Sequence, residues 1–157
     1  MKFADFICFK ATLPDLEATD RNGAIEALVS SLNKAGKLKR GTSKELIKAV
    51  IDREKEASTG IGKGVAVPHV KHPSVKEVVG VVGLSSTGID FSSLDKQPVF
   101  SILLLISPVE APDQHIQAME SVFRHLQQEK FRRFLRQCKT VEAVEDLLRE
   151  ADTRQIW

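Results

Sequence analysis

Two stretches in the first third of the chain repeat apolar residues every three or four positions, as amphipathic helices do. The first follows Asp20, a residue type that caps helix N-termini, and stops near Gly36, a residue type common just past helix C-termini. The second follows Thr42 and Glu45, which have the spacing of a capping box, and ends around residues 53–57. The two predicted apolar stripes consist of Ala24, Ile25, Leu28, Val29 and Leu32, and of Leu46, Ile47, Val50 and Ile51.

The pattern changes after residue 60, where short runs of β-branched and aliphatic residues are bounded by Gly, Pro and Ser. Such runs are typical of strands, and they occur at Val65–Val67, Val78–Leu84 and Val99–Ile106. The last run is apolar almost throughout, which indicates a central strand covered on both faces. We also expect an extended segment at Ile7–Leu13.

Helical periodicity returns in the last third of the chain. Pro112 can occupy the first turn of a long helix, a further helical piece follows it, and Thr140 can cap a last helix. The predicted core positions of these three helices are Ile116, Met119, Phe123 and Leu126, then Phe131, Phe134 and Leu135, then Val141, Val144, Leu147 and Leu148. Helices at both ends with strands in the middle predict an α/β fold, with a single central mixed sheet flanked by helices on both faces in three α/β/α layers.

Size and charge narrow the class of protein. The 157 residues are most simply one domain, 1–157, with a core from about residue 20 to 150. The formal net charge is only +2, so no strong field favours a nucleic acid or a membrane surface. The densest basic cluster lies on a predicted helix, and we interpret it as a solvated face in preference to a nucleic-acid patch: Lys130, Arg132, Arg133 and Arg136.

Neither the cysteines nor the hydropathy pattern points to a secreted or membrane protein. Cys8 and Cys138 are far apart and belong to no metal-binding or redox pattern, so each is interpreted as a small core residue. The segment 1–13 is broken by charges and does not resemble a signal peptide. The longest strongly apolar run, 99–106, is far shorter than the roughly 20 residues that span a bilayer. We therefore expect a cytoplasmic protein without stable membrane insertion.

The segment 60–69, Gly-Ile-Gly-Lys-Gly-Val-Ala-Val-Pro-His, is the most informative in the chain. Its three alternating glycines permit backbone conformations and close approaches that a side chain would forbid. Pro68 has no amide donor, so the chain cannot easily continue as a central strand. His69 follows directly at this break on a stiff backbone, which suits a reactive side chain.

Two further residues gain meaning beside His69. His115 lies in the first turns of the helix that begins near Pro112, where unpaired amides favour an anion; the alternative is a half-buried histidine with only a structural role. Arg53, at the end of the second helix, is either a surface ion-pair partner or a phosphate ligand, because guanidinium binds phosphate oxygens in a bidentate way.

The remaining histidines offer an alternative chemistry. His72 precedes Pro73 and is expected in an exposed turn, and His125 is expected to have no special role. A metal site could combine His69, His72 and His115 with Asp113, because first-row metals favour imidazole. The His-x-x-His spacing in a proline-containing loop gives this alternative little support.

The segment from Arg53 through Gly60–His69 resembles the phosphorylation-site signature of the mannitol/fructose-type enzyme IIA family. These are phosphocarrier domains of the bacterial phosphoenolpyruvate-dependent sugar phosphotransferase system, and they include nitrogen-regulatory members. The segment Asp113–Gln117 resembles the second histidine segment of that family, which follows a core strand and opens a helix. The resemblance covers about residues 20–150, with the same order of elements.

The resemblance implies a phosphotransferase component with a phosphohistidine intermediate. It makes His69 the phosphoacceptor, His115 its pocket partner and Arg53 a phosphate-binding side chain. The implied donor is a histidine-containing phosphocarrier protein, and the implied acceptor is an enzyme IIB or a regulatory target protein. No cofactor, metal or nucleic acid is implied.

Two features bear on the alternatives within the family. Residues 1–157 contain no cysteine segment like that of an enzyme IIB and no membrane domain, so we expect a protein closer to the stand-alone, often regulatory, members. In such a protein the phosphorylation state would switch the binding of target proteins. Family members often have glycine directly after the active histidine, whereas this chain has Val70, which leaves the local backbone shape open.

Overall fold

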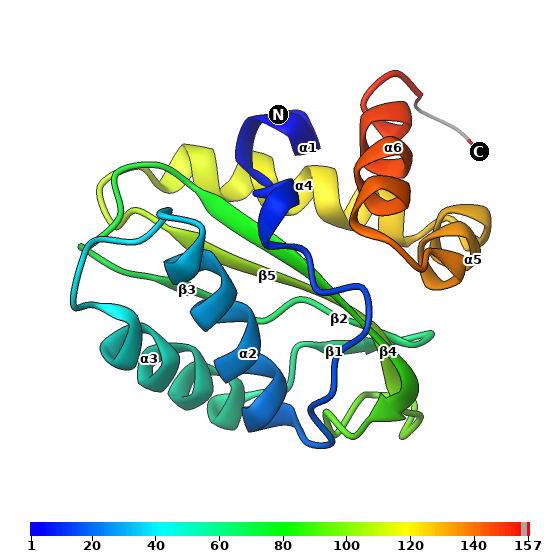
Figure 1. Cartoon of the computed structure of the whole chain (residues 1–157), viewed down its shortest axis with the longest axis horizontal. Helices are drawn as coiled ribbons and strands as arrows, with labels where there is room; N and C mark the ends of the chain where they lie inside the picture. Colours follow the sequence, from blue (N-terminus) through cyan, green and yellow to red (C-terminus); the bar gives the residue numbers. More distant parts are fainter. Residues whose placement is uncertain (155–156) are drawn as a thin grey trace.

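The computed structural model describes residues 1–154 and 157, and within them one mixed sheet of five strands lies between two layers of helices (Figure 1). Strand β5 is central: β4 pairs with one edge antiparallel, while β2 and β3 pair in parallel with successive stretches of the other edge. Strand β1 adds antiparallel to β2. In chain order the strands are β1 (Gly60–Gly62), β2 (Val65–Ala66), β3 (His69–Lys71), β4 (Val79–Ile89) and β5 (Val99–Ser107). The predicted α/β fold with a mixed sheet is confirmed.

The helices divide between the two faces of the sheet. Helices α2 and α3 cover one face, and α1, α4, α5 and α6 cover the other (Figure 1). None of the helices in the described part of the chain is long and apolar enough to cross a membrane. The helical segments are α1 (Phe3–Phe6), a 3₁₀ turn η1 (Phe9–Ala11), α2 (Arg21–Lys34), α3 (Ser43–Glu56), α4 (Pro112–Leu126), α5 (Glu129–Gln137) and α6 (Val141–Ala151).

Strand β5 shows why a nearly continuous apolar run predicts a central strand. Successive side chains of a strand point to opposite faces of the sheet. Ile102, Leu104 and Ile106 therefore face the core under α2 and α3, whereas Leu103 and Leu105 face the core under α4 and α6. All five are fully buried, because both faces of the sheet are covered.

Two of the predicted helix caps are formed. The Asp20 carboxylate accepts a hydrogen bond from the backbone N–H of Gly23 at 2.6 Å, and the Thr140 hydroxyl accepts one from Ala143 at 3.0 Å. At the C-terminal end of α2, Gly36 adopts a φ of 76°, and the Lys37 N–H reaches back to the carbonyl of Leu32. The boundaries predicted from these residues are confirmed.

The capping box predicted at Thr42 and Glu45 is wrong. The Thr42 hydroxyl donates to the carbonyl of Lys39 at 2.6 Å instead of capping α3. The Glu45 side chain points the other way and contacts His72 at 3.1 Å. Each side chain finds a partner outside the helix, so the spacing alone was not sufficient to form the motif.

The N-terminal segment is only partly extended. Ile7 and Leu13 form isolated parallel bridges with Gly80 and Gly83 of β4, but η1 interrupts the extended segment that was predicted between them. The Cys8 N–H donates to the carbonyl of Gly80 at 2.8 Å. These bonds cover the edge of β4 that β5 leaves free, which protects it from pairing with another chain.

The apolar stripe of α4 differs from the predicted one. Ile116 was placed in the core, yet 54% of its surface is exposed. The buried face instead includes Ala118 and Val122 together with two polar residues, Ser121 and His125. The Ser121 hydroxyl donates to the carbonyl of Met1, and the ring nitrogens of His125 lie 2.8 and 3.1 Å from the carbonyl oxygens of Ser121 and Ala151. His125 therefore has a structural role that the hydrophobic pattern did not indicate.

Gly80 is a position in β4 where the sheet and the N-terminal segment approach closely. A Cβ atom there would lie 2.7 Å from a methyl of Leu105, 2.9 Å from a methyl of Ile7 and 3.2 Å from the carbonyl oxygen of Leu104. We predict that Gly80→Ala lowers the free energy of unfolding by about 1–3 kcal/mol, because the core must overpack. Urea denaturation measures this, with Ser86→Ala at an exposed position of the same strand as the control. Equal stability of the two variants would contradict the packing described here.

Candidate functional site

The glycine-rich segment forms a hairpin instead of a loop. Strands β1 and β2 pair antiparallel, and Lys63 and Gly64 at the turn have φ values of 59° and 80°. Left-handed conformations at both central positions match the twist of a two-residue hairpin. The hairpin delivers the chain to Pro68, whose carbonyl accepts a hydrogen bond from the N–H of Leu105 in β5 at 2.9 Å. His69 then opens β3, which the sequence did not predict.

The ring of His69 is held in one tautomer. Its Nδ1 lies 2.7 Å from the carbonyl oxygen of Val67, which can only accept, so Nδ1 carries the proton and Nε2 has a free lone pair. Burial lowers the pKa of His69, and the positive charges of Arg53 and Lys71 lower it further. The hydrogen bond to Val67 and the charge of Glu54 act in the opposite direction without reversing the shift. The lowered pKa favours the neutral imidazole at pH 7.

His115 faces His69 from the start of α4. The two ring centroids are 5.6 Å apart, with 41° between the ring planes. The hydroxyl oxygen of Ser107, at the end of β5, lies 2.6 Å from Nδ1 of His115 and fixes the orientation of the ring. Burial lowers the pKa of His115, and so do the nearby His69 and Lys71. Ser107 lies just past the predicted end of its strand and was missed for that reason.

Two cationic side chains lie near the histidine pair: the charge of Arg53 acts on His69, and that of Lys71 acts on both histidines. Arg53 is half-buried at the C-terminal end of α3, and its Nη1 donates to the carbonyl of Ala57 at 2.9 Å. Lys71 is exposed, and its charge acts on both His69 and His115. The sequence reasoning missed Lys71, although a residue two positions after His69 in a strand projects from the same face. The structure thus brings His69, His115 and Arg53 together and adds Lys71 to them.

Glu54 positions the start of the hairpin. It is only 2% exposed, and its two carboxylate oxygens accept hydrogen bonds from the backbone N–H and the hydroxyl of Thr59, both at 2.6 Å. The carbonyl of Thr59 in turn accepts the N–H of Val67, two residues before His69. Glu54 was missed, yet it continues the buried stripe of α3 four residues after Val50.

Val70 occupies the position where the family pattern often has glycine. It pairs in parallel with Ile106 of β5, and its side chain packs against the core under α2 and α3. The backbone around Val70 is therefore regular strand, and the valine side chain finds room without a positive φ.

His72 does not join the other two histidines. It is 8% exposed, so the predicted exposed turn is wrong; Ser74 lies 2.7 Å from its Nδ1 and Glu45 lies 3.1 Å from its Nε2. The alternative metal site would have used this residue. Across residues 1–154 and 157, no group of three or more histidine, cysteine or acidic side chains is placed to hold a metal ion.

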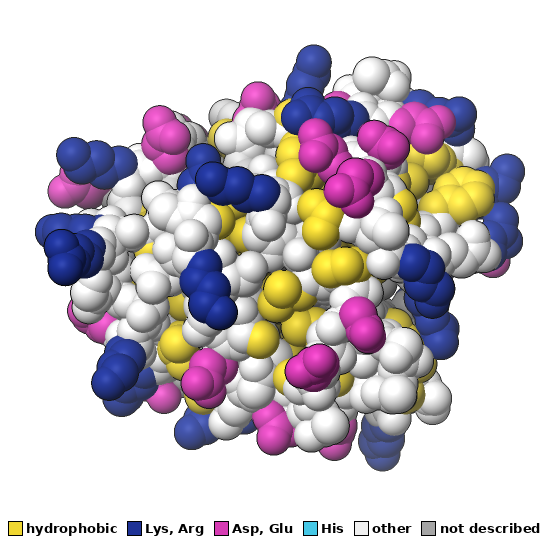
Figure 2. All heavy atoms as spheres, viewed as in Figure 1, with side chains coloured by type: hydrophobic (Ala, Val, Ile, Leu, Met, Phe, Trp, Pro, Cys, Tyr) yellow, Lys and Arg dark blue, Asp and Glu magenta, His cyan; other side chains and the backbone are white. Residues whose placement is uncertain are grey.

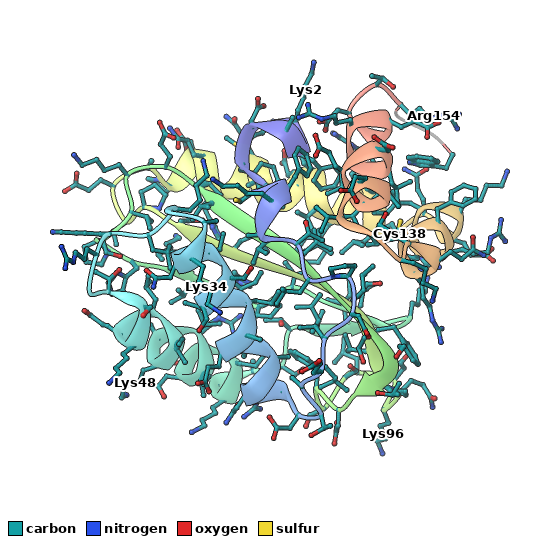
Figure 3. The ribbon with its side chains drawn as sticks, viewed as in Figure 1. Lys2, Lys34, Lys48, Lys96, Cys138 and Arg154 are labelled. Carbon is teal, nitrogen blue, oxygen red and sulfur yellow. The ribbon has the colours of Figure 1, made fainter. Side chains whose placement is uncertain are left out.

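The two cysteines lie away from these residues. Cys8 is buried, as predicted, whereas Cys138 is half-buried between α5 and α6 (Figure 3). Burial raises the pKa of the Cys138 thiol, so it is less readily ionised than a free cysteine. Neither has the environment of a reactive nucleophile.

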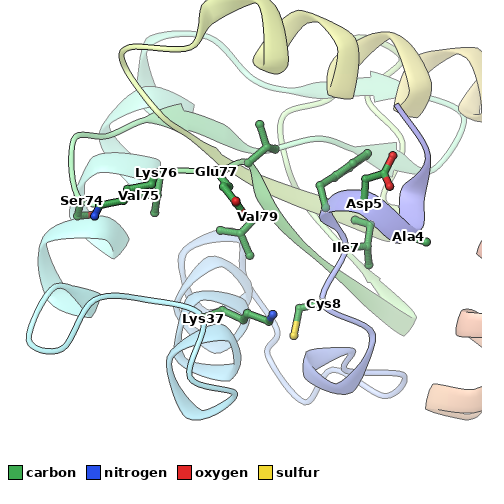
Figure 4. A pocket seen from close by; sticks show the side chains of 12 residues that line it. Ala4, Asp5, Ile7, Cys8, Lys37, Ser74, Val75, Lys76, Glu77 and Val79 are labelled. Carbon is green, nitrogen blue, oxygen red and sulfur yellow. The ribbon is translucent and has the colours of Figure 1, made fainter.

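A separate hollow of about 410 Å³ opens between the N-terminal segment and residues 74–79 (Figure 4). Its charged lining residues carry both signs, with Asp5 and Glu77 beside Lys37 and Lys76. No charge of one sign dominates there, and His69, His115 and Arg53 are not among the residues that line it. The histidine pair, rather than this hollow, is the candidate functional site.

The role of Glu54 can be tested by unfolding. We predict that Glu54→Ala lowers the free energy of unfolding by about 1–3 kcal/mol, because it leaves the N–H and hydroxyl of Thr59 without their partners. The matched control is Glu56→Ala, an exposed position of the same helix. A cost no larger than that of the control would show that the Glu54 contact does not support the hairpin.

The lowered pKa values predict a pH dependence. Because the folded protein binds protons at His69 and His115 less tightly than the unfolded chain does, the unfolded state gains protons first as the pH falls below about 6.5. The two histidines therefore make their full contribution to the free energy of unfolding above about pH 6.5. That contribution is lost as the pH falls through the pKa values of His69 and His115 in the folded protein. NMR titration should place both pKa values below the ordinary one, and His69→Gln should weaken the acid dependence of stability. An unchanged dependence in that variant would contradict the assignment.

Comparisons with known proteins identify the family of this chain. The family model for the phosphoenolpyruvate-dependent sugar phosphotransferase system, EIIA 2, matches residues 9–151. The fructose-specific EIIABC component of Bacillus subtilis is 31% identical over 97% of this chain, which spans only 24% of that relative's length. A nitrogen regulatory protein of Bradyrhizobium diazoefficiens is 30% identical over 94% of this chain and 95% of its own.

Among solved structures, the nitrogen regulatory protein IIA-Ntr from Neisseria meningitidis superposes with a TM-score of 0.83. It is 25% identical in sequence, and the alignment covers 93% of this chain and 98% of that one. The match of the family model over most of the chain, together with this likeness of fold, settles the family. The chain belongs to the EIIA type 2 family of the phosphoenolpyruvate-dependent sugar phosphotransferase system.

Proposed function

We propose that this protein is a phosphocarrier that accepts a phosphoryl group on Nε2 of His69 and passes it to a downstream protein. The observation that carries the proposal is the hydrogen bond from Nδ1 of His69 to the carbonyl of Val67. It leaves Nε2 as an unprotonated nucleophile at neutral pH, which is the form that can attack phosphorus.

The reaction exchanges one N–P bond for another. The lone pair of Nε2 attacks the phosphorus atom of a donor phosphohistidine, and the electron pair of the broken N–P bond returns to the donor nitrogen. No base has to remove a proton from His69 first, because Nε2 carries none. Onward transfer repeats the exchange with a nucleophile of the acceptor, and neither step needs a metal or a nucleotide.

The neighbours of His69 stabilise the transferred group in this proposal. Negative charge on the three equatorial oxygens is the main electrostatic demand of phosphoryl transfer. Arg53 and Lys71 supply positive charge beside the ring. The Ser107 hydroxyl can donate to Nδ1 of His115, which leaves a proton on Nε2 of His115 for a phosphoryl oxygen.

The donor and the acceptor are proteins in this proposal, and the surface beside His115 suits them. Val109 and Ile116 expose 51% and 54% of their surface on the loop and the first turns of α4. Such apolar side chains near a reactive group favour contact with another protein surface. We propose a histidine-containing phosphocarrier protein as the donor and an enzyme IIB-type component as the acceptor. The name of the EIIABC relative suggests the acceptor.

A second function is supported by the other kind of relative. The Bradyrhizobium protein of nearly equal length is named a nitrogen regulatory protein. We therefore also propose that phosphorylation of His69 switches binding to a regulatory target, since a phosphoryl group adds negative charge at the docking surface. Capture of targets with phosphorylated and unphosphorylated protein tests this, and a partner set that ignores the phosphate would argue against a switch.

Phosphorylation with labelled phosphoenolpyruvate, enzyme I and the histidine-containing carrier tests the main proposal. We predict that His69→Gln incorporates less than about one hundredth of the parent label, because the nucleophile is gone. His115→Gln should accept phosphate but transfer it to an enzyme IIB roughly 10²-fold more slowly, since it loses one stabilising donor.

Lys34→Gln, at an exposed position of α2, serves as the control and should behave like the parent. Equal acid-labile phosphate on His69→Gln and on the parent would overturn the assignment of the phosphoacceptor. Normal onward transfer by His115→Gln would return His115 to a structural role.

A further inference from the structure

A second cavity, with several charged lining residues, lies between the turn of the β1–β2 hairpin and helix α5. Its volume is about 550 Å³, within the range of small-molecule sites. The residues that line it do not include His69, His115 or Arg53. We call this cavity the α5 cleft. Its charged lining residues are Lys63, Glu129, Arg132, Arg133, Arg136 and Lys139.

The cations of the α5 cleft are mostly unneutralised. Arg133 lies 3.7 Å from Glu129, but in residues 1–154 and 157 no carboxylate lies within 4.0 Å of the charged ends of the other four basic side chains. Five basic residues and one acidic residue meet here in a protein whose net charge is only +2. Dark-blue side chains are visible along the edge of the molecule where α5 lies (Figure 2). Such a concentration attracts anions.

Two of the arginines are held in place before any ligand arrives. The guanidinium carbon of Arg136 lies 3.5 Å from the ring centroid of Phe100, a stacked contact that fixes the plane of the group. Nη1 of Arg132 donates to the carbonyl of Leu126 at 2.8 Å, and its remaining N–H groups stay available. Pre-oriented guanidinium groups lose less freedom when they bind phosphate oxygens.

The backbone conformation of Lys63, at the turn of the hairpin, is unusual for a lysine. It sits at a φ of 59°, a left-handed position where hairpins favour Asn or Gly and where lysine is strained. The backbone N–H of Lys63 is tied to the carboxylate of Asp95 at 2.9 Å, which holds the turn. Lys63 therefore lines the cleft in a backbone conformation that is costly for lysine, as is common at binding positions.

We propose that the α5 cleft binds a small polyanion, namely a metabolite that carries at least two phosphate groups. Several fixed cations around one cavity match clustered phosphates, and guanidinium groups bind phosphate in a bidentate way. A nucleic acid would need a basic stripe longer than one cavity, whereas these cations line a single cavity. The cleft is separate from the site proposed for phosphoryl transfer, so its occupation does not require that function.

The hairpin connects the two sites. The carbonyl of Gly64 accepts the N–H groups of Phe100 and Ser101 at 2.8 and 3.1 Å, which ties the turn to the start of β5. The same hairpin runs on through β2 to His69. A ligand between Lys63 and Arg136 would therefore contact the element that delivers the phosphoacceptor strand.

Calorimetric titration of the unphosphorylated chain with inorganic triphosphate tests the proposal. We expect saturable one-to-one binding that weakens as the salt concentration rises. Lys63→Asn keeps a residue suited to the left-handed turn, and Arg136→Gln removes an exposed charge. Each should weaken binding by about tenfold, which corresponds to one charge-assisted contact. Orthophosphate should bind at least about tenfold more weakly than triphosphate.

Two controls separate this site from others. Lys34→Gln removes one positive charge on α2, across the sheet from α5 (Figure 3), and should leave the affinity unchanged. His69→Gln should also bind triphosphate like the parent, whatever its loss of phosphorylation. Absence of saturable binding, parent affinity in both cleft variants, or loss of binding in His69→Gln alone would overturn the proposal. Tighter binding of a single-stranded oligonucleotide, with NMR shifts beyond the cleft, would replace it by a nucleic-acid surface.

Discussion

Strand β5 hydrogen-bonds along both of its edges and is buried on both faces, and this constraint fixes its register. A slip by one residue would move every aliphatic side chain of the strand into the wrong core. The same register sets His69 opposite Leu105 and Lys71 opposite Ser107. Ser107 then reaches His115 on the helix that follows. The position of His69, and that of the Ser107 hydroxyl that orients His115, therefore follow from strand pairing in the core.

The sequence predicts the elements whose burial is purely apolar. The stripes of α2 and α3 and the run in β5 were located correctly because each buries aliphatic side chains with a clear period. The prediction fails on α4, where Ser121 and His125 are buried against backbone carbonyls while Ile116 is exposed. Polar side chains satisfied by distant backbone atoms carry no periodic signal, so their burial could not be foreseen.

The residues of the candidate site were likewise predictable only in part. His69, His115 and Arg53 could be singled out because a proline break, a helix start and a helix end mark them in the sequence. Glu54 and Ser107 could not, since each acts on a partner that only the fold brings close. Strands β1 and β3 are three residues long, too short for alternation to show. Glu45 was predicted to contact the start of its own helix, but its side chain instead contacts His72, 27 residues away in the sequence.

The hydrogen bond between Nδ1 of His69 and the carbonyl of Val67 also determines how the imidazole behaves as a leaving group in onward transfer. A ring that keeps its Nδ1 proton while Nε2 forms a bond to phosphorus carries a positive charge. Such a ring departs as a neutral imidazole, so no acid has to protonate it when the bond breaks. Arrival and departure at Nε2 would then both proceed without any change in the number of bound protons. The backbone carbonyl of one valine is thus sufficient to make the imidazole both a nucleophile and a good leaving group.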